Sequence, residues 1–198
     1  MSNKVKFGLK NAYYSIINDA IVESVLTRTY GTPVALPGVV NLTLDPKGEK
    51  TEFYADDIAY FIAEKNDGYE GSLEVALVPD AFRKNVLGWK EDANNVMFED
   101  ANVLPKKIAL LFEFSGDKES TRHVLYDVTV SRPGVSGQTK GASIEVQPES
   151  FDIVAGPNPF TGYVKAKVGP GADTEPSTEY TGFFTAVYAF AQPTPPQG

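Results

Sequence analysis

The sequence of 198 residues contains no cysteine and a single histidine, His123. The missing cysteines exclude a disulfide scaffold, catalysis by a thiolate and zinc sites built from cysteine. One histidine excludes a histidine-rich metal site and argues against a catalytic triad. No apolar run approaches the ~18 residues that a membrane-spanning helix needs. No signal peptide is recognisable either, because the first residues lack an apolar stretch. We therefore expect a soluble, cytoplasmically folded protein that is not an enzyme, holds no metal or cofactor and does not insert into membranes.

Positive charge is also scarce. The chain has 18 lysines and arginines against 26 aspartates and glutamates, a net charge of −8. Such a chain repels phosphate backbones, so the release of counterions does not favour tight nucleic-acid binding. The length and the 42% of hydrophobic residues are ordinary for one globular domain. We expect a single domain over residues 1–190, with an extended loop near 45–52, and a flexible proline-rich tail over 191–198.

Alternation of apolar and polar residues predicts many β-strands. The predicted segments are 4–17, 39–44, 53–65, 69–78, 107–115, 122–132, 143–154, 162–168 and 180–190. Residues 20–26 fit a strand or a helix equally well. Turn residues between neighbouring segments predict one hairpin over 53–78 and a second over 107–132.

One segment has helical features. Pro79 opens it, Phe82 and Val86 stand four residues apart, and Gly88 stands where a left-handed cap ends a helix. Eight to ten strands with one short flanking helix predict a mainly-β fold, a β-sandwich or barrel-like sheet. Such a sheet has edges, and an edge that pairs with another copy of the chain produces an oligomer.

Two groups of acids have to be weighed as chemical sites. Glu145 and Glu149 lie four apart on a predicted strand and would form a glycosidase-like pair of carboxylates, or simply a solvated strand face. Asp56, Asp57 and Glu64 are possible calcium ligands, but their spacing fits no EF-hand loop, and solvation or a contact between subunits explains them equally well.

Several runs of the sequence resemble the major tail proteins of long, non-contractile-tailed phages of Gram-positive bacteria. The first run is Asn3–Tyr14, and two more are Leu36–Gly48 and Phe53–Asp57. The last two are Gly68–Glu74 and Val78–Gly88. Together they cover most of residues 3–88, and the length of the chain fits the family as well. None of these runs is a catalytic signature.

The resemblance implies a tail tube protein with a β-sandwich and a flanking helix. In that family six copies join their sheets into a ring, and the rings stack into a hollow tube through which DNA passes. The implied partners are further copies of the chain, together with tape measure, tail terminator and baseplate proteins. The implied location is the virion tail, assembled in the cytoplasm of the host.

Two surfaces follow as hypotheses. The first is a charged turn, which the resemblance implies is a long loop that reaches a neighbouring subunit: Asp45, Pro46, Lys47, Gly48, Glu49, Lys50, Thr51 and Glu52. The second is a pair of acids, Glu70 and Glu74, which either help to line the tube, because a conduit for DNA must not bind phosphates, or equally well face the solvent on its outer wall.

A different class of function fits the same composition. A carbohydrate-binding β-sandwich, such as an adhesion module, would use exposed aromatic rings as platforms for sugars. Aromatic residues make up 12% of the chain, but Trp89 is its one tryptophan, the usual platform, and it precedes an acidic segment. Tyrosine and phenylalanine serve equally well in a β-core or in a contact between subunits.

Overall fold

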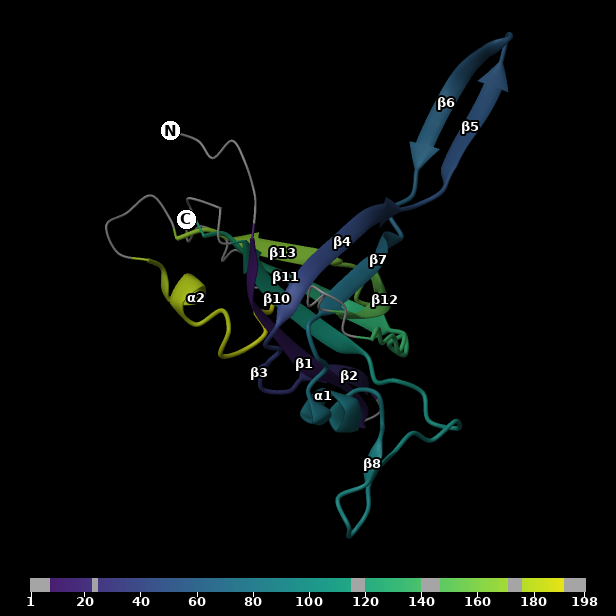
Figure 1. Ribbon diagram of the computed structural model, residues 1–198. Coiled ribbons are helices and arrows are strands. Elements are labelled where there is room, and N and C mark those ends of the chain that lie inside the picture. The colour runs from purple at the N-terminus through teal and green to yellow at the C-terminus, as the bar shows by residue number, and fades with distance from the viewer. Residues whose placement is uncertain (1–7, 23–24, 115–119, 140–146, 171–175, 191–198) are drawn as a thin grey trace.

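One large antiparallel sheet organises the protein, as the computed structural model shows for residues 8–22, 25–114, 120–139, 147–170 and 176–190 (Figure 1). The nine strands are β1 (Leu9–Val22), β2 (Val25–Tyr30), β3 (Val34–Ala35), β4 (Val39–Lys47), β7 (Gly68–Val75), β10 (Ile108–Phe114), β11 (Arg122–Val130), β12 (Glu149–Gly156) and β13 (Lys165–Val168). Their order is β2-β1-β10-β11-β12-β7-β4, with β3 paired to β1 and β13 paired to β11. The predicted mainly-β class is confirmed.

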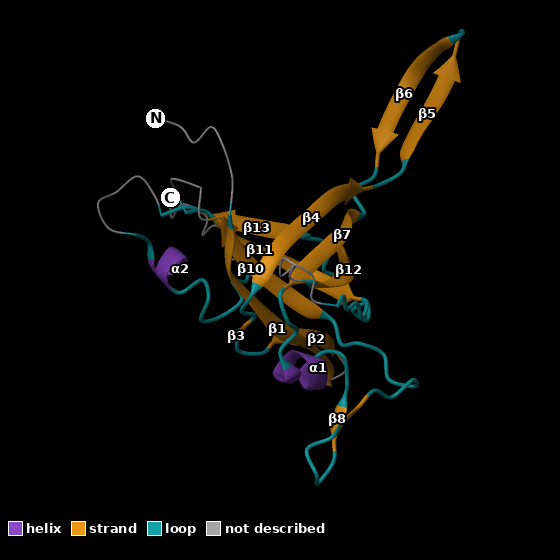
Figure 2. Ribbon diagram, in the orientation of Figure 1, coloured by secondary structure: helices purple, strands orange, loops and turns teal. Residues whose placement is uncertain are grey.

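Four short strands stand apart from this sheet. β5 (Lys50–Ala55) pairs with β6 (Ile58–Glu64), and β8 (Lys90–Glu91) pairs with β9 (Met97–Phe98). The β5–β6 ribbon and the segment with β8 project from opposite ends of the molecule (Figure 2). The helices are short: α1 (Asp80–Asn85) confirms the predicted helix, and α2 (Thr178–Thr181) is new.

The sheet buries apolar side chains on both of its faces. One cluster joins β1, β10 and β11 to β7, β12 and α1, so the sheet curls until β1 and β4 pack against the same core. A second cluster lies on the other face, where Phe183 and its neighbours cover Leu111 and Val124. Because β10 has a covered face on each side, all residues from Ile108 to Glu113 are buried, which explains its unbroken apolar run.

Three sequence predictions require correction. Residues 45–52 are not a turn, because Asp45–Lys47 continue β4 and Lys50–Glu52 begin β5. The segments of 53–78 do not form a hairpin with each other, because β6 pairs with β5 while β7 pairs with β4 and β12. Residues 180–190 form the end of α2 and a run of turns rather than a strand. The undecided segment 20–26 is extended on both sides of residues 23 and 24.

Glycine 68 marks the point where the chain returns from the β5–β6 ribbon to the sheet. Its φ is +103°, and a Cβ there would lie 1.9 Å from the carbonyl oxygen of Ala155. We expect Gly68→Ala to lower the free energy of unfolding by about 2 kcal/mol or more, because strain and backbone collision add. Gly156→Ala is the control, since a Cβ at Gly156 meets nothing within 4 Å. Equal urea midpoints for the two variants would contradict the prediction.

Candidate assembly surfaces

The β5–β6 ribbon, residues 50–64, is called the arm below. It carries six large apolar side chains that are each between 53% and 72% exposed: Phe53, Tyr54, Ile58, Tyr60, Phe61 and Ile62. A two-stranded ribbon of this size is barely stable alone in water. Exposed apolar surface on this scale marks a site of protein contact. The arm is therefore the first candidate surface.

The register of the arm separates its side chains into two different faces. Phe53 pairs with Phe61, Thr51 with Ala63 and Ala55 with Ile58, and cross-strand partners lie on the same side of a ribbon. Strand alternation places these pairs together, so this side is almost wholly apolar.

The opposite face of the arm holds its charges. Lys50 forms an ion pair of 2.6 Å with Glu52, and the Tyr54 hydroxyl donates a hydrogen bond of 2.7 Å to the same carboxylate. Glu64 pairs with Lys50 across the ribbon. This face also carries Ile62, which pairs with Glu52, and the ring of Tyr54, so it mixes charged and apolar groups, whereas the first side is almost wholly apolar.

The tip of the arm is a two-residue turn made by Asp56 and Asp57. Their φ angles are +51° and +60°, which is the geometry of a type I′ turn. Aspartate tolerates this conformation better than most residues. Glu64 lies at the other end of the arm, so the structure does not bring the three possible calcium ligands together.

The root of the arm is held by main-chain contacts. Lys65 N donates to Glu49 O at 3.0 Å and Asp67 N donates to Lys47 O at 2.9 Å. A Cβ on Gly48 would lie 1.8 Å from the carbonyl oxygen of Lys65. Most of the predicted contact segment 45–52 therefore forms this root and the first residues of the arm, while the exposed apolar residues follow it.

The second candidate surface is the solvent-facing side of β4, β7 and β12, called the acidic face below. Its side chains form three cross-strand rows: Asn41–Glu74–Ser150, Thr43–Ser72–Asp152 and Asp45–Glu70–Val154. Leu73 and Phe151 point to the core from the other side of the same strands. Glu70 and Glu74 thus share one face, as expected. Asp45, which the sequence analysis assigned to the contact segment 45–52, lies on this face as well, and sequence reasoning did not single out Asp152.

Small polar side chains fill the acidic face between its carboxylates. Asp45 lies directly opposite Glu70, and like charges in that arrangement destabilise a sheet. Lys47 relieves part of this repulsion through an ion pair of 3.0 Å with Glu70, and it is the one basic side chain on this face of the three strands as described. The face therefore keeps an excess of carboxylates over basic side chains.

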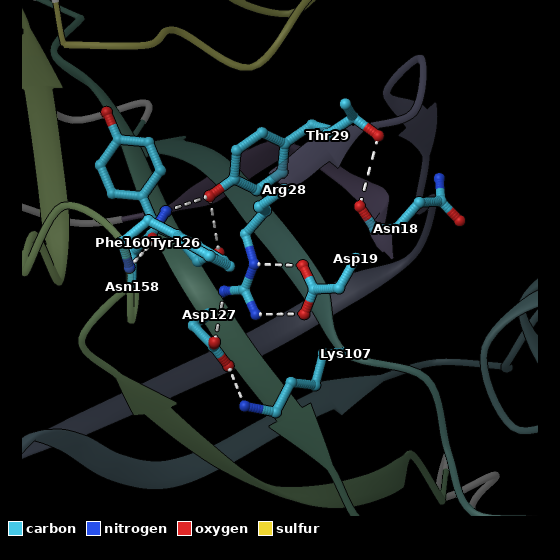
Figure 3. Close-up of polar contacts among 10 residues, drawn as sticks. Asn18, Asp19, Arg28, Thr29, Lys107, Tyr126, Asp127, Asn158 and Phe160 are labelled. Carbon is cyan, nitrogen blue, oxygen red and sulfur yellow. Dashed lines mark hydrogen bonds and ion pairs between the residues drawn. The ribbon is translucent and has the colours of Figure 1, made fainter. Parts of the chain in front are cut away.

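A buried ion network fixes the outermost hairpin, β1–β2, to the sheet (Figure 3). Arg28 donates two hydrogen bonds to Asp19, at 2.7 and 2.8 Å, and one to Asp127 at 2.5 Å. Lys107 lies 2.8 Å from the other oxygen of Asp127. The side chains of Arg28 and Asp127 are each 4% exposed. The hydrogen bonds from Arg28 hold the pKa of the Asp19 carboxyl below its ordinary value.

Tyr126 next to this network makes unfolding sensitive to alkali. Burial, followed by the neighbouring Tyr30 and Tyr188, raises the pKa of Tyr126 to about 12 from 10.0. The unfolded chain loses this proton near pH 10 and the folded chain only near 12, so stability is lost between these values at up to ~1.4 kcal/mol per pH unit. We expect Tyr126→Phe to give a shallower loss of stability in urea titrations from pH 9.5 to 11.5. An unchanged slope would contradict this assignment.

The remaining acids and the tryptophan have structural contacts. Glu149 accepts hydrogen bonds from Arg83 at 2.6 and 2.8 Å and from Val78 N at 2.7 Å, which joins α1 to β12. Its possible partner Glu145 lies outside the described residues. The guanidinium of Arg83 also lies over the ring of Trp89, 5.1 Å from its centre, so one face of that ring is covered.

Comparison with known proteins does not supply a family. No family model matches the chain, and no curated protein matches it. Among the described residues, no group of three or more histidines, aspartates and glutamates is arranged to hold a metal ion. Neither of the helices in those residues is long and apolar enough to cross a membrane.

Proposed function

We propose that the protein is the structural subunit of a phage tail tube, in which copies of the chain form rings that stack into a conduit for DNA. The observation that carries this proposal is the arm, whose apolar face has no cover within its own subunit among the described residues. The resemblance of residues 3–88 to major tail proteins supports the same assignment. The rings are proposed to be hexameric, as that resemblance implies.

The arm and the acidic face have separate roles in this proposal. The arm of one copy packs its apolar side, with Phe53 and Phe61, against a neighbouring copy. The acidic face lines the tube, where its carboxylates repel the phosphates of passing DNA. Tape measure, tail terminator and baseplate proteins are the further proposed partners, and the assembled protein is placed in the virion tail after assembly in the host cytoplasm.

Electron microscopy of the purified protein at rising concentration tests the proposal. We expect rings and then tubes with a central channel, because each copy offers both an arm and the surface that receives it. The backbone amides of the arm, residues 50–64, must then become protected from hydrogen exchange on assembly. Particles that stay monomeric with and without tail nucleating proteins would overturn the proposal.

Charge reversal tests the role of the acidic face. We expect Glu70→Lys combined with Glu74→Lys to slow DNA ejection from assembled particles by about tenfold or more at low salt, because each new lysine attracts a phosphate in a salt-dependent way. The deficit should shrink as salt rises.

The matched control reverses Glu91 and Glu99 in the β8–β9 segment, which changes the net charge equally at the end of the molecule opposite the arm. Its ejection rate should remain near that of the unmodified protein. If both double variants eject DNA at the unmodified rate with unmodified salt dependence, the acidic face does not line the tube.

A further inference from the structure

An aromatic groove lies between β2, β11 and the segment that follows β12. Its cavity has a volume of about 340 Å³. The rings that line it are those of Tyr30, Tyr126, Phe160, Tyr163 and Phe190. Phe160, Tyr163 and Phe190 remain 41% to 53% exposed, although large apolar side chains usually lie in the core. This groove lies outside the arm and the acidic face.

The most deeply placed polar groups around the groove, those of Arg28, Asn158, Tyr30 and Tyr126, already have partners within the subunit. All three guanidinium nitrogens of Arg28 donate to Asp19 or Asp127 (Figure 3). Asn158 donates to the Tyr30 hydroxyl at 2.9 Å and accepts from Phe160 N at 2.9 Å. A sugar needs free donors and acceptors for its hydroxyls, and leaving them unpaired is costly. The groove therefore favours a ligand with apolar rings and few polar groups.

Proline-rich segments are ligands of this kind. Grooves lined by aromatic rings bind prolines in many peptide-recognition domains, because the proline ring is apolar and packs against aromatic faces, and because the preformed segment loses little entropy. The residues that follow Phe190 in this chain are Ala-Gln-Pro-Thr-Pro-Pro-Gln-Gly, with prolines at 193, 195 and 196. They lie outside the described residues.

We propose that the groove docks this proline-rich segment, residues 191–198 of its own subunit. Phe190 lines the groove and contacts the ring of Tyr163 at 4.9 Å, so the chain reaches the groove at the residue before the segment begins. Three residues span at most ~11 Å, which keeps Pro193 within reach of the rings. The docked prolines cover Tyr163 and Phe190, and the segment is held on the subunit before any assembly.

Disulfide trapping tests this docking, and the chain suits it because it contains no cysteine. The experiment uses the full chain with Thr161→Cys, an exposed lining residue, and Thr194→Cys in the segment. The matched control carries the same two cysteines with prolines 193, 195 and 196 replaced by serine. The tether is equally long in both, so tethering alone gives equal rates of disulfide formation.

We expect an intramolecular disulfide that forms about tenfold faster with the prolines than with the serines, because docking raises the effective concentration of the two thiols. Tyr163→Ala, added to the double-cysteine chain that keeps its prolines, should slow disulfide formation as well. Circular dichroism checks that all variants remain folded. Equal rates would overturn the docking. A disulfide formed mainly between two molecules would show that the segment occupies the groove of another copy, and would overturn docking within the subunit. Dilute monomer is used, so the result does not depend on tube formation.

Discussion

Replacing residues 49–65 with Asn-Gly should leave a folded subunit that forms no tubes. The replacement joins β4 to β7 through a short connection. These two strands already pair with each other, from Val39 opposite Val75 to Lys47 opposite Gly68. The core clusters contain no residue of the arm, so their packing stays intact. Assembly fails because the apolar contact between copies has been removed. Circular dichroism and urea unfolding measure the fold, and electron microscopy measures assembly.

Two pairs of point variants locate this contact on one side of the arm. Phe53→Ser with Phe61→Ser removes a cross-strand pair from the apolar side, and we expect the critical concentration to rise by about 100-fold, since two buried aromatic rings are lost. Lys50→Ser with Glu64→Ser removes a cross-strand pair from the charged side, and we expect this variant to change the critical concentration by less than about threefold. Tubes formed normally without the arm, or equal effects of the two pairs, would refute its role.

The largest loss of stability is expected for Arg28→Met. The substitution leaves Asp127 buried without its closest cation, and breaking a buried ion pair costs about 3–5 kcal/mol. Lys107 still contacts Asp127, so the loss should fall at the lower end of that range, about 3 kcal/mol. The midpoint and slope of urea unfolding measure it.

Arg132→Met is the matched control for the buried arginine. Arg132 is 72% exposed and forms its ion pair with Glu99 on the surface, at 3.2 Å. A surface pair contributes at most about 1 kcal/mol. If both methionine variants unfold at the same urea concentration, the buried network does not hold the β1–β2 hairpin. The two measurements together separate burial from the loss of a charge.

Local pattern predicted most strands because their alternation is visible within a few residues. The strands near 39–44, 107–115 and 122–132 and the helix beginning at Pro79 all occur in the structure, as does the positive φ of Gly88. Pairing was harder to predict. Asn66-Asp67-Gly68 has the composition of a hairpin turn, but Gly68 instead lets the chain pass close to Ala155, a contact with a strand about 90 residues away. No pattern among the residues next to Gly68 in the sequence indicates a contact with so distant a strand.

The candidate surfaces were predictable to different extents. Glu70 and Glu74 share a face because strand alternation requires it, whereas Asp45 and Asp152 join them through strand pairings that the sequence does not display. The aromatic segment 180–190 shows the opposite problem. Phe183 lies in the turns after α2 and covers the outer side of β10 and β11. The apolar composition of segment 180–190 alone resembles that of a strand.

The main-chain contacts at Gly48 and Gly68 have an evolutionary consequence. Because carbonyl groups rather than side chains orient the ribbon, the sequence from 51 to 63 is free to diverge without disturbing the body that presents it. In the proposed tube, the choice of partner copy would then depend on residues 51–63 alone. Two lineages that differ only in this segment would form separate polymers inside one cell, even though the remainder of each subunit is interchangeable.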